Sequence, residues 1–184
     1  MTVEVPKVDS TVPSRVYPHT HVLIALCPVL AYYALRHRRL PSWHVISAVA
    51  VGSLLPDLVD KPLAHSLSLL PSGRVFLHSL PIAIPIAIVA MAYGWQTNRV
   101  SMAGGFVVGL LLHPVGDFDT ELLGGSVPAH MLWPLVPVET RFTEPFWTVP
   151  WTLFSAVVLA CLAVLLARDV WVQLRTTERR DASD

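Results

Sequence analysis

Apolar segments separated by short polar stretches recur along the chain, and five of them could cross a membrane. A helix needs roughly 20 mostly apolar residues to span the hydrocarbon core of a bilayer. The third and fifth segments combine sufficient length with the absence of charge, whereas the first and second are short enough to require tilting or a thinner membrane. The pattern predicts an all-α, polytopic membrane helix bundle with about five transmembrane helices, over His19–Leu35, Trp43–Val59, Val75–Trp95, Val100–Phe118 and Phe146–Ala167.

The stretches around these segments complete the predicted domain organisation. Residues 1–18 contain charges and prolines but no continuous apolar core, which predicts a loosely ordered arm rather than a cleavable signal peptide. Residues 19–167 form the predicted membrane domain, and residues 168–184 form a polar cytoplasmic tail. Met131–Leu135, after the fourth segment, is too short to span and predicts an interfacial or re-entrant segment.

Composition supports membrane residence and argues against several other classes of protein. Hydrophobic residues make up 53% of the chain and charged residues only 14%, with a formal net charge of zero. A neutral chain has no general attraction for nucleic acid, so the expected partners are membrane lipids. Cys27 and Cys161 lie in apolar runs, where free thiols behave as small hydrophobes, so no disulfide framework or zinc-binding cysteine motif is expected. The sequence leaves the oligomeric state open.

The distribution of positive charge predicts the orientation of the chain in a plasma (inner) membrane. Cytoplasmic loops are enriched in Lys and Arg. Alternating spans place eight basic residues on one side (Arg36, Arg38, Arg39, Arg99, Arg168, Arg175, Arg179 and Arg180) and five on the other (Lys7, Arg15, Lys61, Arg74 and Arg141). This bias predicts an outside N-terminus and a cytoplasmic C-terminus.

Histidines and aspartates collect at particular ends of the predicted spans. His21 lies near the start of the first, Asp57 near the end of the second, His78 near the start of the third, and His113 and Asp117 near the end of the fourth. Starts of odd spans and ends of even spans lie on the same side of a membrane. Because charged groups in apolar segments are costly, they are usually paired or functional. We therefore expect these side chains to converge at one membrane face.

The spacing and type of these residues favour a metal site. His113 and Asp117 are four apart and share one helix face, and Asp57 and Asp60 are three apart with the same consequence, although Pro56 can distort that turn. Imidazole and carboxylate without sulfur suit a divalent ion, with zinc ahead of manganese and iron. Such an ion can lower the pKa of bound water toward ~7 and polarise an ester or phosphoryl oxygen, which is hydrolase chemistry.

Several further residues also bear on the predicted site or on helix packing. Asp60 is either part of the catalytic machinery or, beside Lys61, a simple surface ion pair. Arg74 is a candidate to steady an anionic oxygen of the substrate. His65 is either a reserve ligand or, as we favour, a solvent-exposed loop residue. The glycines of the fourth segment, Gly104, Gly105 and Gly109, are expected to permit close helix packing.

Four strings, taken in order, resemble the membrane-bound metal-dependent hydrolases known as the YdjM-like, LexA-regulated inner-membrane proteins. The strings are Gly52-Ser-Leu-Leu-Pro-Asp-Leu-Val-Asp60, Arg74-Val-Phe-Leu-His-Ser79, Gly109-Leu-Leu-Leu-His-Pro-Val-Gly-Asp117 and Leu132-Trp-Pro134. The resemblance implies a prokaryotic polytopic membrane protein with hydrolase activity, and His21, Asp57, His78, His113 and Asp117 as metal ligands. The family is in turn similar to zinc-dependent phospholipases C and nuclease-type phosphodiesterases, which implies a phosphoester substrate that could derive from a lipid.

The sequence departs from the family pattern at two places in the proposed site. Gly73 precedes Arg74, where the family commonly has the histidine of a His-Arg-Gly run, so one imidazole is missing unless His65 replaces it. The second acidic residue, Asp60, follows Asp57 at three positions rather than two. These departures leave open how many side chains of the site bind the metal.

Three functions are compatible with these residues. The leading hypothesis is a hydrolase in which Asp57, His78, His113 and Asp117 hold the ion and His21 completes the shell. A transporter that relays protons or metal ions would use the same groups, but it would also need a polar route to the opposite face. The third is a structural membrane protein whose metal only ties helices together.

Overall fold

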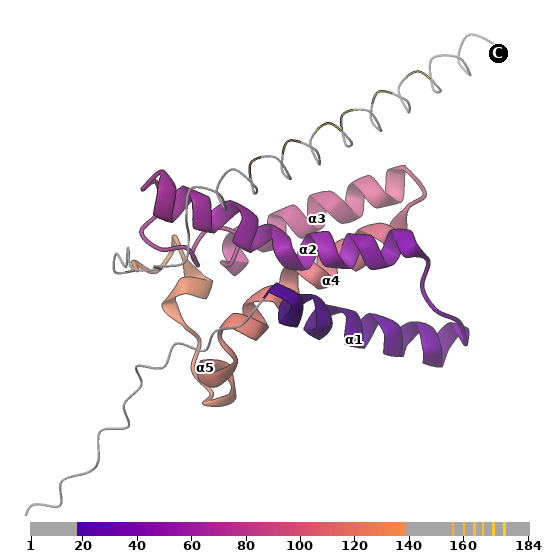
Figure 1. The fold of residues 1–184 in the computed structure, drawn as a ribbon, viewed down its shortest axis with the longest axis horizontal. Helices are drawn as coiled ribbons and strands as arrows, with labels where there is room; N and C mark the ends of the chain where they lie inside the picture. The colour runs from indigo at the N-terminus through magenta and orange to yellow at the C-terminus, as the bar shows by residue number, and fades with distance from the viewer. Residues whose placement is uncertain are drawn as a thin grey trace, which may run out of the picture. The chain divides into compact units, whose positions relative to one another are not determined.

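A computed structural model describes residues 18–138 together with six further positions, Ala156, Ala160, Val164, Ala167, Trp171 and Arg175. This part of the chain is helical and contains no strand. Figure 1 shows the elements in chain order: α1 (Pro18–His37), α2 (Trp43–Lys61), the π-helical turn η1 (Pro62–Ser66), α3 (Leu80–Gln96), α4 (Val100–Asp117), α5 (Asp119–Leu123) and the 3-10 turn η2 (Ala129–Leu132).

The described residues divide into two compact units, each with its own internal contacts. The first unit contains 18–54 and 90–127, and the second contains 55–89 and 128–138. The boundaries at Leu54 and Val89 fall inside α2 and α3, so each of these helices contributes one part to each unit.

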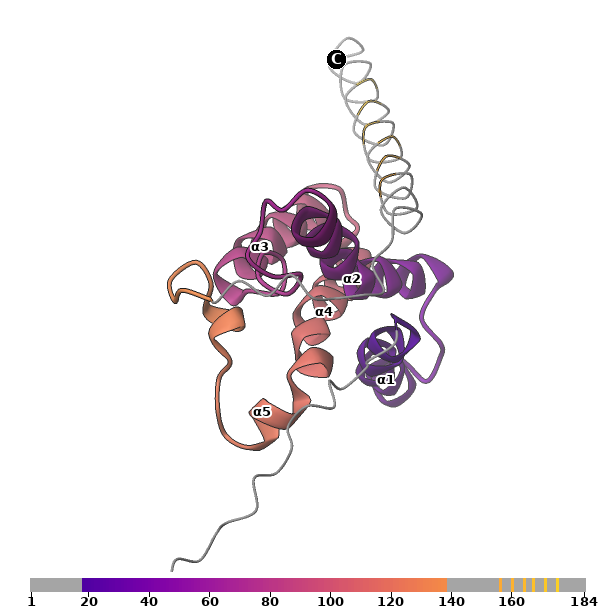
Figure 2. The same cartoon turned by 60° about the vertical axis from the view of Figure 1, so that its left-hand side comes forward.

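In the first unit, α1 lies alongside α4, as Figures 1 and 2 show from two directions. The start of α1 meets the end of α4, because His21 contacts Asp117, so these helices run antiparallel. Ala25 and Val29 of α1 pack with Val45 and Val49 of α2 in a small apolar core. The four buried members of this core are one alanine and three valines, and Leu26, Tyr33, Val108 and Leu112 pack against them.

Glycines mediate the closest approach between α2 and α4. A Cβ atom on Gly109 would overlap the carbonyl oxygen of Val49 and lie 2.7 Å from the backbone nitrogen of Ser53. A Cβ on Gly105 would lie 3.0 Å from the carbonyl oxygen of Val45, whereas one on Gly104 would meet nothing within 4 Å. The predicted role in helix packing is therefore confirmed for Gly105 and Gly109, and it is wrong for Gly104.

In the second unit, the end of α2 continues into η1, and a series of turns then leads to α3. The ring of Phe76 in these turns meets Trp133, just after η2, edge to face with ring centroids 6.4 Å apart. Val75 and Leu77 are buried on either side of Phe76. This packing anchors the turns that precede α3.

The described residues have polar side chains inside and many apolar side chains outside. The buried polar residues are His21, Ser53, Asp57, Asp60, Ser72, His78, Ser79, His113 and Asp117. Large apolar side chains such as Leu23, Leu35, Trp43, Ile88 and Trp95 are exposed. A water-soluble domain normally buries side chains of this apolar kind, and charged groups are almost never fully buried unless paired. The distribution is the one expected when lipid, rather than water, surrounds the helices.

Two described helices are long and apolar enough to cross a membrane, Trp43–Ser66, which is α2 with η1, and Val100–Asp117, which is α4. Leu80–Gln96 is apolar but shorter. The first four predicted segments all correspond to helices, but the third begins at Leu80 rather than at Val75, because a turn occupies the five preceding residues. The second helix reaches Lys61, two residues beyond the predicted end.

Other predicted segments lie wholly or mostly outside the described residues. The N-terminal arm is outside them except for Pro18, which begins α1. Of the fifth predicted segment, the described positions Ala156, Ala160, Val164 and Ala167 are helical, as are Trp171 and Arg175 in the predicted tail. The predicted re-entrant segment, Met131–Leu135, overlaps the end of the short turn η2, which is Ala129–Leu132.

Candidate metal centre

The first unit brings together two histidines and one aspartate from the start of α1 and the end of α4. The imidazoles of His21 and His113 stack with their ring centroids 4.0 Å apart. Nε2 of His21 lies 3.4 Å from one oxygen of Asp117, and Nε2 of His113 lies 3.5 Å from the other. Gly116 makes room for this stack, because a Cβ there would lie 2.9 Å from Nδ1 of His21. Both imidazoles therefore present Nε2 to one carboxylate.

A backbone contact fixes the orientation of the His113 ring. Nδ1 of His113 donates to the carbonyl oxygen of Ser53, at 2.5 Å. A carbonyl oxygen can only accept, so Nδ1 carries the proton and Nε2 keeps its lone pair. His113 is thereby held as a ready ligand through Nε2.

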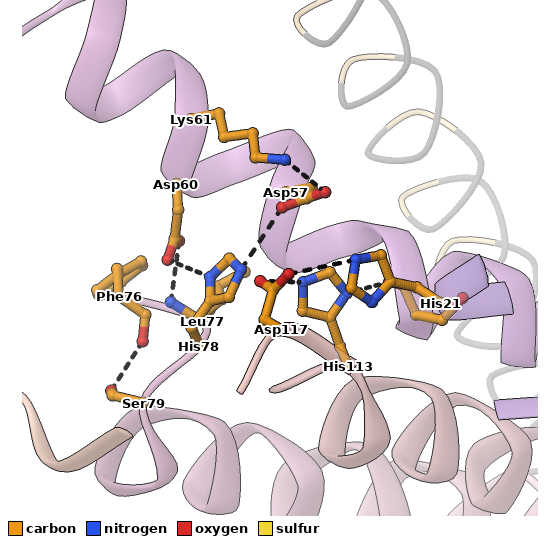
Figure 3. Close-up of polar contacts among 11 residues, drawn as sticks. His21, Asp57, Asp60, Lys61, Phe76, Leu77, His78, Ser79, His113 and Asp117 are labelled. Atoms are coloured by element: carbon orange, nitrogen blue, oxygen red, sulfur yellow. Dashed lines mark hydrogen bonds and ion pairs between the residues drawn. The ribbon is translucent and has the colours of Figure 1, made fainter. Parts of the chain in front are cut away.

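The second unit contains a cluster of one histidine and two aspartates (Figure 3). Nδ1 of His78 donates to one oxygen of Asp60 at 2.7 Å, and the other Asp60 oxygen accepts the backbone N–H of Leu77 at 2.9 Å. Nε2 of His78 lies 3.5 Å from an oxygen of Asp57. Both His78 and Asp60 are fully buried. Asp60 thus fixes the imidazole so that its Nε2 lone pair faces Asp57.

A tight turn before α3 positions His78. The carbonyl oxygen of Phe76 accepts the backbone N–H of Ser79 at 3.2 Å and the Ser79 hydroxyl at 2.8 Å. The Ser79 carbonyl oxygen then accepts the N–H of Ala83 at 2.8 Å, which begins the hydrogen-bond ladder of α3. The His-Ser pair of the sequence motif therefore closes a turn, and it does not open the helix as the sequence pattern predicted.

Lys61 pairs with Asp57, one helical turn before it, through an Nζ–Oδ2 contact of 2.7 Å. Asp57 therefore has one oxygen on Lys61 and the other toward His78. Asp60 has no part in this ion pair and is fully buried. The reading of Asp60 and Lys61 as a surface ion pair is wrong.

The side chain of His65 fills the space above Gly73. A Cβ on Gly73 would lie 2.5 Å from Nε2 of His65 and 3.4 Å from Cγ of Lys61. Both ring nitrogens of His65 are buried, so the expectation of a solvent-exposed residue is wrong. An imidazole from η1 thus occupies the space next to the position where the family pattern places a histidine. Arg74, the next residue, is half-buried with its Nε atom buried.

Several donor-atom distances within these clusters match those expected around a metal ion. Two ligand atoms about 2.1 Å from a tetrahedral zinc are about 3.4 Å apart. The Nε2-to-carboxylate separations in the two clusters are 3.4 and 3.5 Å, longer than most hydrogen bonds. Metal-bound histidines usually donate their other N–H to a carboxylate or backbone carbonyl, as His78 and His113 do. Four buried side chains, Asp57, His78, His113 and Asp117, could hold a metal ion.

Comparison with known proteins connects these residues to a family. The model of the YdjM inner membrane protein family matches residues 17–179. The chain belongs to this family. The comparison with curated proteins gives no match, and neither does the comparison with solved structures. Membership of the YdjM family agrees with the exposed apolar side chains of the helices and assigns the chain to the inner membrane.

Each unit confirms part of the convergence predicted from span alternation. His21, His113 and Asp117 meet in the first unit, and Asp57, Asp60 and His78 meet in the second. Sequence reasoning missed Lys61 as the partner of Asp57, although their i, i+4 spacing is a signal for such a pair. It also missed Ser53, which takes part through its backbone, so its side chain carries no signal. The catalytic roles predicted for Asp60 and Arg74 stay predictions.

Proposed function

We propose that this protein is a membrane-embedded, metal-dependent hydrolase that acts on an ester or phosphoester, with a lipid-derived phosphoester as the leading substrate class. Asp57, His78, His113 and Asp117 would hold one divalent ion, and His21 would complete the shell. The observation that carries the proposal is the set of Nε2-to-carboxylate separations of 3.4–3.5 Å. Hydrogen bonds on Nδ1 fix the rings of His78 and His113 in the same ligand-ready tautomer.

The continuity of α2 supports a single site built from both clusters. Ser53, whose carbonyl oxygen holds His113, and Asp57, which faces His78, belong to the same uninterrupted helix. Residues four apart lie on one helix face, about one turn from each other. Ser53 and Asp57 therefore lie about one helical turn apart on α2, and this is the observation that supports one shared ion.

The proposed setting is a bundle of about five transmembrane helices with the N-terminus outside and the C-terminus in the cytoplasm. Family membership, the apolar helices α2 and α4, and the exposed apolar side chains support it. The basic residues Arg36, Arg38 and Arg39 lie in and just after the last turn of α1, at the end opposite to His21, and such residues are enriched on the cytoplasmic side. This orientation would open the metal site toward the outer face of the inner membrane.

When bound, the ion would supply Lewis-acid polarisation and an activated water, with zinc preferred over manganese or iron for this nitrogen and oxygen donor set. The residues of the chain would hold the ion, orient its ligands and bind the substrate. Asp60 keeps His78 in its tautomer, the Ser53 carbonyl oxygen does the same for His113, and Arg74 would bind an anionic oxygen of the substrate. Burial of the ligands excludes bulk water, which strengthens these electrostatic contacts.

The proposal is tested by metal analysis of detergent-purified protein. Activity assays on a panel of aryl esters, phosphomonoesters and phosphodiesters follow. We expect a stoichiometric divalent metal and turnover of at least one class, both lost in His113→Ala. The control is His37→Ala, which removes an exposed imidazole of α1. Absence of bound metal, or the same metal content in His113→Ala as in the wild type, would contradict the proposal.

A structural metal site is the second candidate, favoured by the near-complete burial of every proposed ligand. It predicts protein that loses its fold when the metal is removed and turns over no member of the panel. A proton or metal transporter has weaker support, because α3 contains no charged residue that could extend a polar route across the membrane. If proteoliposomes take up metal and this uptake disappears in Asp57→Asn, transport would be favoured over hydrolysis as the function.

A further inference from the structure

Three arginines lie close together where α1 ends and the chain turns into α2. Arg36 lies in the last turn of α1, and Arg38 and Arg39 follow the last residue of that helix. All three side chains are exposed, whereas Pro41, two residues further on, is buried and anchors the segment. We call residues 36–43 the arginine loop.

The acidic residues of the first unit lie far from the arginine loop. Among the described residues of this unit, 18–54 and 90–127, the first acidic one is Asp117, and the others are in α5. Val45, near the start of α2, lies next to Gly105, near the start of α4, where a Cβ would be 3.0 Å from the Val45 carbonyl oxygen. The length of α4, about 25 Å, therefore separates Asp117 from the loop. Exposed charges interact over only about 10 Å at 0.1 M salt, so these carboxylates do not neutralise the arginines.

Arg38 adopts a backbone conformation that is costly for a residue with a side chain. Its φ angle is +52°, in the left-handed region. The residue that ends a helix in this conformation is usually glycine, because glycine has no Cβ to clash with the backbone. Glycine would therefore stop α1 with less strain than arginine does. Backbone outliers of this kind point to a function for the residue that carries them.

Exposed apolar and aromatic side chains accompany the arginines. Within the loop, Leu40 is 75% exposed and Trp43 is 68% exposed. Trp95, in the last turn of α3, is exposed at the same end of the first unit, where Figure 1 shows the turn between α3 and α4. Tryptophan collects at membrane–water interfaces, where its ring lies at the level of the headgroups. This pattern places the arginines at the depth of phospholipid phosphates.

We propose that the arginine loop binds the headgroup of an anionic phospholipid. Arg36, Arg38 and Arg39 bind the phosphate oxygens, because the planar guanidinium group offers paired N–H donors that match a phosphate. Leu40 and Trp43 contact the start of the acyl chains. Basic clusters that directly follow a membrane helix attract anionic lipids, so the charge of the loop and that of the headgroup are complementary.

The C-terminal part of the chain is a weaker candidate for this occupant. Residues 168–184 contain four basic and four acidic residues, so they have no surplus of negative charge to offer the loop. The metal cluster of the first unit is separate from the loop, since His21 lies near the start of α1 and the loop follows its end. Lipid binding at the loop is therefore independent of the proposed hydrolase function.

The first test titrates detergent-purified full-length protein with a fluorescently labelled phosphatidylglycerol, and phosphatidylcholine with the same acyl chains is the comparison. We expect the wild type to bind phosphatidylglycerol about tenfold or more tightly. About 1 M salt should remove most of this preference, because the screening length falls to about 3 Å. The combined variant Arg36→Gln, Arg38→Gln, Arg39→Gln should lose the preference, and the matched lysine variant should keep most of it. Equal affinity of the wild type for the two lipids would overturn the proposal, whatever the folding of the variants.

The second test uses Arg38→Gly, which separates lipid binding from the ending of the helix. Glycine relieves the backbone strain, so this variant should be at least as stable to heat as the wild type and yet bind phosphatidylglycerol several-fold more weakly. Asn98→Gly is the matched control, because Asn98 also has a positive φ angle, +57°, but carries no charge. It should bind the lipid as the wild type does. Equal lipid affinity in the two glycine variants would mean that Arg38 only ends the helix.

Glycerol 3-phosphate distinguishes a lipid from a soluble phosphate compound. It presents the phosphate without acyl chains, so at equal concentration it should not displace the labelled lipid from the wild type. Displacement at equal concentration would overturn the assignment to a lipid. The arginine variants should retain the metal content of the wild type. A protein that binds no metal but prefers phosphatidylglycerol contradicts only the proposed function, and one that binds metal without this preference contradicts only the role of the loop.

Discussion

The carboxylate of Asp60 and the imidazole of His78 are joined by a 2.7 Å hydrogen bond between two completely buried side chains. The second oxygen of Asp60 is held by the backbone N–H of Leu77. Both oxygens of this carboxylate are thus held within the chain, one of them by His78. In the proposed function, Asp60 is a positioning residue for His78, and this assignment can be tested.

Asp60→Asn should raise the dissociation constant for zinc about 10- to 100-fold, the usual consequence of altering the partner of a metal-bound histidine. The measurement is a competition titration with a chromogenic chelator, with the fold checked by circular dichroism. Glu121→Gln, which removes an exposed carboxylate charge from α5, is the matched control and should bind zinc as the wild type does. Unchanged affinity in folded Asp60→Asn would show that Asp60 does not orient the ligand.

The glycines of α4 offer a matched pair for the packing of α2. Gly109→Ala places a methyl group against the backbone of Val49 and Ser53, so we expect destabilisation of about 1–3 kcal/mol, as for other overpacked sites. Gly104→Ala meets nothing within 4 Å and should be neutral or stabilising by up to about 1 kcal/mol. Denaturation of both variants in the same detergent gives the comparison. Equal effects would contradict the close approach at Gly109.

Gly116 provides a way to move His21 without removing it. In Gly116→Ala the added methyl group would lie 2.9 Å from Nδ1 of His21, so the ring must shift away from His113 and Asp117. We expect weaker zinc binding than in the wild type, with a loss no greater than that of His21→Ala. If His21→Ala itself retains full zinc affinity, His21 is a packing partner of His113 and not a ligand.

Gly73 offers a test of whether the His65 ring contributes to the proposed activity. Gly73→Ala should displace the His65 ring, because the new Cβ would lie 2.5 Å from its Nε2, while the stem of Lys61 at 3.4 Å is in ordinary contact. We expect lower turnover of the substrate with unchanged zinc stoichiometry. His65→Ala is the companion variant, and Gly73→Ala in that background should have no further effect because the clash is gone. A further loss in the double variant would mean that Gly73 matters for another reason.

Removal of the metal should destabilise the fold. Chelation of an ion present at about 100 times its dissociation constant removes about 2.7 kcal/mol of stabilisation. Buried carboxylates would also lose the cation that offsets their charge. Thermal unfolding with and without chelator measures the difference, and His113→Ala, which already lacks a ligand, should respond little. A wild type that is insensitive to the chelator would contradict an ion bound at these residues.

The sequence alone predicted where the first four helices lie and which residue types form the candidate site. Apolar runs punctuated by basic loops located the first four helices to within a few residues, because both the bilayer and the helix backbone impose simple periodic constraints. Span alternation correctly grouped His21 with His113 and Asp117, since it depends only on which end of a helix a residue occupies. The beginning of α3 was misplaced because Val75 and Leu77 are as apolar as a helix but pack into a turn.

Only the tertiary structure decided which atom of each side chain is available. The carbonyl oxygen of Ser53 fixes the tautomer of His113 across 60 residues of sequence, and a backbone group leaves no trace in residue identity. Asp60 and Lys61 are adjacent in the sequence and look like an ion pair, but one is fully buried on His78 and the other reaches back to Asp57. The reason is geometric. Helical residues one apart point about 100° away from each other, so neighbours in sequence enter different environments.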